Sequence, residues 1–194
     1  MGPIFRGAAA VCLVALSGLQ PAAGDLEFSV EKAGEDAYTS VNLARVGQMS
    51  VRIGVLTENS TLVEGLDAKL QATASEPEPA ATCDDAIAKF KKTKFVAQLT
   101  GADDDNYRQA VQDALTAGLE ALPSYPEDGG WTTFWTKPDG ANLAHLLSSN
   151  STKVGCAVGT CTEGAQEYRN SPTTVTFLVC QMDPAAEVDK APFE

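Results

Sequence analysis

Histidine is nearly absent from this sequence, since His145 is the only one in 194 residues. A zinc site needs three or four donors, and the chain has neither a second histidine nor a C-x-x-C spacing. The usual Ser-His and Cys-His nucleophile pairs are also missing in any obvious form. The 26 acidic residues guarantee chance carboxylate pairs, but none forms a distinctive motif. We therefore predict no catalytic residue, no metal site and no cofactor, and an enzyme is the weaker hypothesis.

Basic residues are also few. The chain has 14 Lys and Arg against 26 Asp and Glu, which gives a net charge of −12. Binding to nucleic acid or to an anionic membrane surface depends on Lys and Arg that neutralise phosphates. The composition therefore excludes nucleic acid as a partner.

No hydrophobic run is long enough to cross a bilayer, which takes about 20 apolar residues. The one candidate, residues 8–19, follows Arg6 and precedes the small residues Ala22, Ala23 and Gly24. That order is typical of a secretory signal peptide. We predict a signal peptide over residues 1–24 and a single secreted domain over residues 25–194, with no transmembrane span. Cleavage removes Arg6 and Cys12, so the mature net charge is −13.

Four cysteines remain after cleavage: Cys83, Cys156, Cys161 and Cys180. An even number in an exported chain predicts disulfides, and four cysteines allow three pairings. If the stretches around Cys156 and Cys180 are adjacent strands, these two can face each other, which leaves Cys161 for Cys83. A disulfide also stabilises the fold more when it closes a longer loop, by about 4 kcal/mol for some 80 residues. A tight Cys156–Cys161 loop is the competing pairing.

Helical patterns dominate the first two thirds of the mature chain. Residues 25–35 are interpreted as a loose leader, and residues 74–82, "ASEPEPAAT", as an exposed Pro/Glu loop. Thr61 and Glu64 have the spacing of a capping box before a short amphipathic helix. The strongest pattern places apolar residues on one face of residues 107–122, and the acidic residues 103–105 suit the start of that helix better than a calcium loop. The early part of residues 36–56 fits a helix and the later part is ambiguous. Further helices are predicted near residues 84–90 and 141–147.

Strand patterns dominate the final third. "KVGCAV" and "TTVTFLVC" favour extended structure, and the polar, Gly- and Pro-containing segment between them predicts an antiparallel pair. "WTTFWT", residues 131–136, is aromatic and β-branched, and is predicted as a strand with its aromatic side chains in the core. Helices followed by a late antiparallel sheet indicate the α+β class, with a tail after about residue 185.

The stretch "STKVGCAVGTC" followed by "FLVCQMDP" resembles the C-terminal signature of the CAP superfamily of cysteine-rich secretory proteins. "NLAHLLSSNSTKVGCAVGTC" and "AVQDALTAGLEALPSYP" resemble, within that group, the SAG surface antigens of Eimeria-type coccidian parasites. The likeness is specific over residues 142–184. It implies a CAP-like three-layer α-β-α sandwich with an antiparallel sheet, braced by the disulfides Cys156–Cys180 and Cys83–Cys161. Relatives of this kind usually end in a tail that is replaced by a GPI anchor, and no such signal follows "VDKAPFE".

One departure from the family concerns metal binding. Many CAP proteins have a cleft of two His and two acidic residues that can hold a divalent metal, and one of those His lies fourteen positions before the Gly-Cys cysteine. That position is Asn142 here. His145 is therefore expected to be a partly buried helix residue and not a ligand.

Two surface features have functional interpretations. Lys89, Lys91, Lys92 and Lys94 form the one basic cluster, interpreted as a solvated helix face, with contact to a sulfated or sialylated host glycan as the alternative. Asn59 and Asn150 begin the sequons Asn-Ser-Thr and are predicted acceptors for N-glycosylation.

Two functional hypotheses follow. The favoured one is a non-catalytic secreted or surface-displayed parasite antigen that takes part in host-cell attachment or immune interaction, with a host receptor, glycan or antibody as partner. The alternative is a secreted small-ligand carrier or hydrolase. An antigen is expected to lack a cleft where polar groups with shifted pKa values converge, whereas a carrier or enzyme needs a pocket of several hundred Å³.

Overall fold

The computed structural model describes residues 26–47, 53–100, 106–127, 129–164 and 173–193. The predicted signal peptide and the acidic residues 103–105 lie outside the described residues.

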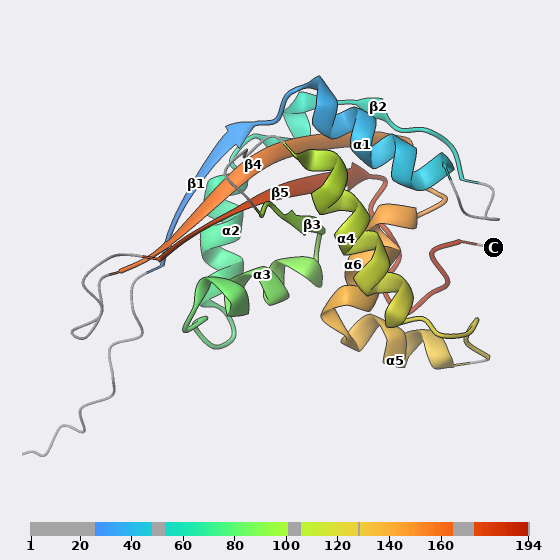
Figure 1. The fold of residues 1–194 in the computed structure, drawn as a ribbon. Coiled ribbons are helices and arrows are strands. Elements are labelled where there is room, and N and C mark those ends of the chain that lie inside the picture. The colour runs from blue at the N-terminus through green and yellow to red at the C-terminus, as the bar shows by residue number, and fades with distance from the viewer. Residues whose placement is uncertain (1–25, 48–52, 101–105, 128, 165–172, 194) are drawn as a thin grey trace, which may run out of the picture.

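An antiparallel sheet forms the centre of the molecule (Figure 1). The β-branched stretches around the late cysteines form β4 (Lys153–Glu163) and β5 (Thr173–Asp183), which pair along their whole length. β1 (Leu26–Lys32) lies antiparallel on the outer side of β4, and β3 (Phe95–Gln98) lies antiparallel on the outer side of β5. The short β2 (Thr57–Glu58) runs parallel to the start of β4.

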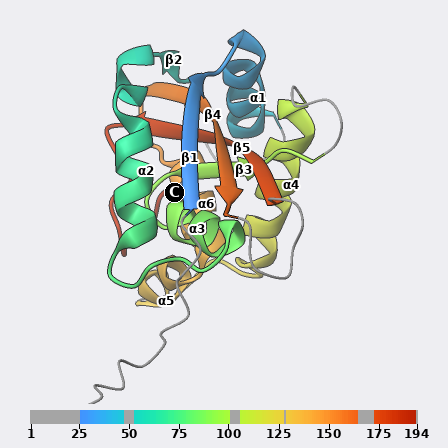
Figure 2. The same cartoon turned by 90° about the vertical axis from the view of Figure 1, so that its left-hand side faces the viewer.

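Helices cover both faces of this sheet because successive strand residues point to opposite sides. In β5, Leu178 and Cys180 enter the core under α1 (Glu35–Val46), α4 (Tyr107–Glu120), α5 (Gly130–Thr136) and α6 (Pro138–Leu147). Phe177 and Val179 enter the second core, under α2 (Leu66–Ser75) and α3 (Cys83–Lys91). Figure 2 shows α2 on one side of the sheet and α1 and α4 on the other. The predicted α+β sandwich is confirmed.

Local sequence signals explain where the helices begin. Asn106 caps α4, since its side chain accepts a hydrogen bond from the backbone N–H of Gln109. Thr82 and Asp85 form a reciprocal capping box at the start of α3. Pro138 occupies the first turn of α6, where its missing N–H costs nothing.

The predicted strand at residues 131–136 is wrong, because this segment is helix α5. The aromatic residues Trp131, Phe134 and Trp135 recur at i, i+3 and i+4, which is the helical period. Phe134 and Trp135 are buried, 3% and 5% exposed, as expected for core aromatics. Tertiary packing of this stripe outweighs the strand propensity of the individual residues.

Three further expectations are corrected. Residues 26–32 are strand β1 and not a loose leader, and there Leu26, Phe28 and Val30 are more buried than the residues between them. β3 has no counterpart among the predicted elements. Thr61 and Glu64 form no capping box, because Asn59 caps a 3₁₀ helix (Ser60–Val63, labelled η1) and α2 starts only after Gly65, whose φ is +64°.

A buried arginine ties the α1 face together. Arg45 is fully buried, and its guanidinium donates hydrogen bonds to the carbonyl oxygens of Gly54, Leu146 and Ser148 at 3.1, 2.6 and 3.0 Å. Burial lowers the pKa of Arg45 to about 10, so it stays charged at neutral pH. These bonds join α1 to the segment before β2 and to the end of α6.

The C-terminal segment packs against α5 and α6. The indole N–H of Trp135 donates to the carbonyl of Lys190 at 2.8 Å, and the amide of Ser149 donates to the carbonyl of Pro192 at 2.8 Å. Phe193 is 5% exposed and meets Trp131 edge to face. The segment after residue 185 thus contributes side chains to the core.

Candidate functional site

Both disulfides bridge elements of the sandwich. Cys83, at the start of α3, is joined to Cys161 of β4, and Cys156 of β4 is joined to its cross-strand partner Cys180 of β5. These are the pairs that the family resemblance implies. Cys156 and Cys161 are five residues apart in one strand, so they point to opposite faces of the sheet. That geometry is incompatible with the competing Cys156–Cys161 loop.

Asn142, at the position of the family's metal-binding histidine, serves the fold. Its side-chain amide accepts a hydrogen bond from the N–H of Val96 at 2.7 Å and donates to the carbonyl of Val96 at 2.8 Å. Asn142 is buried, so its side chain satisfies one residue of β3 within the core. Within the described parts of the chain, no three His, Cys, Asp or Glu residues gather in a way that could hold a metal ion.

His145 lies one helical turn further along α6 and is 8% exposed. Its Nε2 is 3.2 Å from the carbonyl oxygen of Lys92, and its ring meets Trp135 edge to face. Burial lowers the pKa of His145, and the charge of Lys94 adds to the effect, although the bond to Lys92 opposes it. The imidazole is therefore neutral at pH 7 and donates its Nε2 proton to Lys92.

The four lysines of the basic cluster do not form one surface in the structure. Lys89 bonds to the carbonyls of Ala74, Glu76 and Glu78 and holds the loop of residues 74–82 against α3. Lys91 forms an ion pair with Asp139 at 2.7 Å, which ties α3 to α6. Lys92 is exposed, and Lys94 is half-buried. Lys94 donates to the hydroxyl of Thr93 at 3.3 Å. The four lysines thus have separate surroundings, and three of them make side-chain contacts within the protein.

Lys94 lines a cleft of about 380 Å³ at the edge of the sheet. β3 pairs with β5 only from Phe177 to Cys180, so Gln181 and Met182 extend beyond Phe95, the N-terminal end of β3. α2 contributes one wall of the cleft and His145 of α6 another. Its lining residues come from five segments of the chain: Lys69, Ala72, Thr73, Thr93, Lys94, Phe95, His145, Cys180, Gln181, Met182, Ala185 and Ala186.

The polar residues of this cleft were missed by sequence reasoning, except for Lys94 and His145. Lys69 and Gln181 are 112 positions apart, and neither belongs to a motif. Only the pairing of β3 with β5 and the position of α2 bring them to one cleft. A weak signal exists in Lys94, the last lysine of the basic cluster, which immediately precedes a buried strand.

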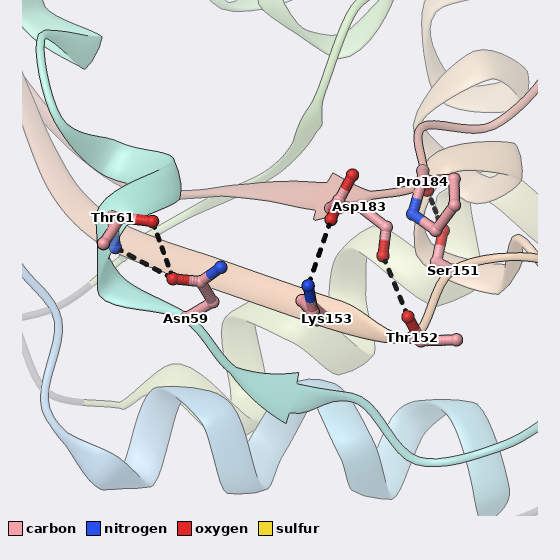
Figure 3. A network of polar contacts seen from close by, with 7 residues as sticks. All are labelled: Asn59, Thr61, Ser151, Thr152, Lys153, Asp183 and Pro184. Atoms are coloured by element: carbon pink, nitrogen blue, oxygen red, sulfur yellow. Dashed lines mark hydrogen bonds and ion pairs between the residues drawn. The ribbon is translucent and has the colours of Figure 1, made fainter.

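The two predicted glycosylation sequons lie near the start of β4 (Figure 3). Asn59 is half-buried, and its side-chain oxygen accepts hydrogen bonds from the backbone N–H and the hydroxyl of Thr61 at 3.2 and 2.7 Å. Asn150 is exposed. The hydroxyl of the following Ser151 donates to the carbonyl of Pro184 at 2.7 Å. Asn150 therefore presents the more open acceptor.

Two further contacts fix the chain at this end of the sheet. The amide of Thr152 donates to the carbonyl of Asp183 at 3.0 Å. Figure 3 shows the hydroxyl of Thr152 donating to the same carbonyl at 3.4 Å, and the exposed ion pair of Lys153 with the Asp183 carboxylate at 3.7 Å. The segment between Asn150 and β4 is thus anchored to the end of β5.

Comparisons with known proteins place the architecture. Residues 66–182 match the model of the CAP family, described as the cysteine-rich secretory protein family. Among solved structures, the Eimeria tenella surface antigen protein SAG19 superimposes with a TM-score of 0.51 at 18% identity, covering 85% of this chain and 92% of that chain. A search of curated proteins found no match. In the described ranges, no helix is long and apolar enough to span a bilayer. The chain belongs to the CAP family of cysteine-rich secretory proteins.

Proposed function

We propose that this protein is a non-catalytic antigen that is secreted or displayed on the surface of a parasite and takes part in host-cell attachment or immune interaction. The observation that carries the proposal is the shared fold with an Eimeria tenella surface antigen over 85% of the chain. The two disulfides support it, because such bridges persist in oxidising, extracellular compartments. Export through a signal peptide cleaved near Gly24 is part of the proposal.

A small-ligand carrier is the second candidate, and the cleft at the end of β3 favours it. Its volume of about 380 Å³ reaches the range of small-molecule sites. Burial lowers the pKa values of Lys94 and His145, which line the cleft. This differs from the expectation that an antigen lacks such a cleft. Among the residues that the structure describes, no Asp or Glu lines the cleft, and His145 uses Nε2 in a bond to Lys92. These features suit binding better than general acid–base chemistry, so a hydrolase is the least supported function.

The attachment function is tested by applying labelled mature protein to host epithelial cells, with and without an excess of unlabelled protein. We expect saturable binding that the unlabelled protein displaces. Reduced and alkylated protein of the same sequence is the matched control, because it keeps the charge of −13 but loses the fold. Binding that rises linearly with concentration, or that the unfolded control reproduces, would contradict attachment.

A further inference from the structure

The cleft lies at the end of β3, where β5 continues without β3 beside it. β3 begins at Phe95, opposite Cys180, while β5 continues to Asp183. Lys69, Ala72 and Thr73 of α2 line the cleft from one layer of the sandwich, and His145 of α6 lines it from the other. The floor is apolar, formed by Phe95, Met182 and Ala186. An apolar floor with polar groups around it is the usual composition of a small-ligand site.

Two lysines line this cleft, although the chain is strongly acidic. Neither Lys69 nor Lys94 has a carboxylate partner among the ion pairs of the described residues, and no acidic residue lines the cleft. Burial and the charge of Lys69 together lower the pKa of Lys94. The two ammonium groups therefore repel each other, and an anion between them relieves that repulsion.

Gln181 adds a polar side chain to the cleft lining. Its side-chain oxygen is buried and accepts no hydrogen bond, which is rare for a buried polar atom. That oxygen has less than 1 Å² of accessible surface, so a ligand in the cleft does not reach it in this conformation. Thr73 and Thr93 also line the cleft. Both hydroxyls donate to backbone carbonyls, of Lys69 and Phe90, and the Thr93 oxygen also accepts from Lys94 Nζ at 3.3 Å.

We propose that this cleft binds an acidic sugar residue at the end of a host glycan chain, with its carboxylate or sulfate between Lys69 and Lys94. The proposal rests on the attachment function and names the ligand class for it. A volume of about 380 Å³ suits one sugar and not an oligosaccharide. The apolar floor suits the ring carbons of the sugar or an attached methyl group. Of the four lysines in the basic cluster, only Lys94 lines the cleft.

Saccharide titrations followed by two-dimensional NMR of the folded chain test this site. The probes are 3′-sialyllactose, lactose 6′-sulfate and unmodified lactose, which share a disaccharide and differ in the acidic group. We expect saturable shifts at Lys94 and Gln181 with at least one acidic probe and none with lactose. The probe that binds distinguishes a carboxylated from a sulfated ligand. Equal shifts with lactose, or no shifts with either acidic probe, would overturn the proposal.

Matched charge variants locate the binding. Lys69→Gln and Lys94→Gln are each expected to lower the affinity for the acidic probe by about tenfold, which is the effect of losing one charge-assisted hydrogen bond. Lys92→Gln changes the net charge equally but at an exposed residue outside the cleft lining, and should leave affinity unchanged. Lys69 is exposed on α2, so its variant keeps the fold. Equal weakening by all three variants would indicate general electrostatics and refute the site.

Cell binding separates this proposal from the function on which it rests. If the protein binds cells saturably but removal of sialic acid and sulfate from the cells changes nothing, the cleft assignment fails and attachment stands. If the acidic probe binds in the cleft but the cells show no saturable binding, attachment fails and the ligand class stands.

Discussion

At the scale of single residues, the sole histidine gives a direct measure of the environment of α6. His145 is the only imidazole in the chain, so NMR follows one titrating ring without assignment. Burial and the charge of Lys94 lower its pKa, and we expect a midpoint below 6.5. The unfolded chain then takes up a proton near pH 6.5 while the folded chain does not. Stability is therefore lost as the pH falls from about 6.5 to the folded pKa.

Two variants test this assignment. Lys94→Gln removes a neighbouring positive charge and should raise the midpoint of His145 toward 6.5. His145→Gln should remove its part of the pH dependence when urea midpoints are compared at pH 7.5 and pH 5.5. A midpoint at or above 6.5 in the unmodified protein would mean that the ring is solvated or paired with an acid.

At the scale of helices and strands, the close crossing of α4 and α6 depends on a glycine. A Cβ built at Gly118 would lie 2.6 Å from the Cβ of Leu143 and 3.1 Å from the carbonyl oxygen of Asp139. Replacing an interior helical glycine with alanine usually stabilises by up to about 1 kcal/mol. Here overpacking costs about 1 to 3 kcal/mol. We expect Gly118→Ala to lower the free energy of unfolding by about 1 kcal/mol, measured by urea denaturation.

Gly54→Ala is the control for this prediction. A Cβ added at Gly54 would meet no atom within 4 Å, and the φ of Gly54 is not positive. That variant should leave stability unchanged or slightly raised, because alanine restricts the unfolded chain. If Gly118→Ala stabilises as much as Gly54→Ala, the helices are not in the close contact described.

The elements that could be predicted from sequence are those with a long, consistent pattern. The apolar face of α4 and the β-branched runs of β4 and β5 indicated their structures correctly. β3 has only four residues and is a strand because β5 offers it backbone partners. β1 is likewise a strand because it pairs with β4, which lies more than 120 positions further along the chain. Short segments take their structure from such distant partners, which local patterns do not reveal.

The candidate site shows the same division. The cysteine pairs could be predicted from the family resemblance, because the signature around Cys156 and Cys180 is local in the sequence. The family match confirms the likeness to CAP proteins. Lys69 and Gln181 gain their significance only when α2 is placed over the open end of β5. A site assembled from five segments, without a motif in any of them, requires the tertiary structure.

At the scale of the whole molecule, the two disulfides differ in what they hold together. Cys83–Cys161 closes a loop of 78 residues and ties the α2 and α3 layer to the sheet. Cys156–Cys180 spans 24 residues between strands that are already paired on both sides of it. Loop entropy assigns about 4.5 kcal/mol to the first bridge and about 3.5 kcal/mol to the second. We expect replacement of Cys83 and Cys161 by alanine to destabilise more than replacement of Cys156 and Cys180, measured by urea denaturation.

Hydrogen exchange distinguishes the loss of one layer from general weakening. Without Cys83–Cys161, amides of α2 and α3 should exchange faster while those of β4 and β5 stay protected, because the strands keep their own ladder. Without Cys156–Cys180, protection should fall evenly through the sheet. The same stability loss in both variants, or equal exchange in both layers, would mean that the sulfur bridges do not hold the layers separately. The long bridge would then add chain-entropy stabilisation without fixing α2, and the wall that α2 gives the cleft would depend on its apolar contacts alone.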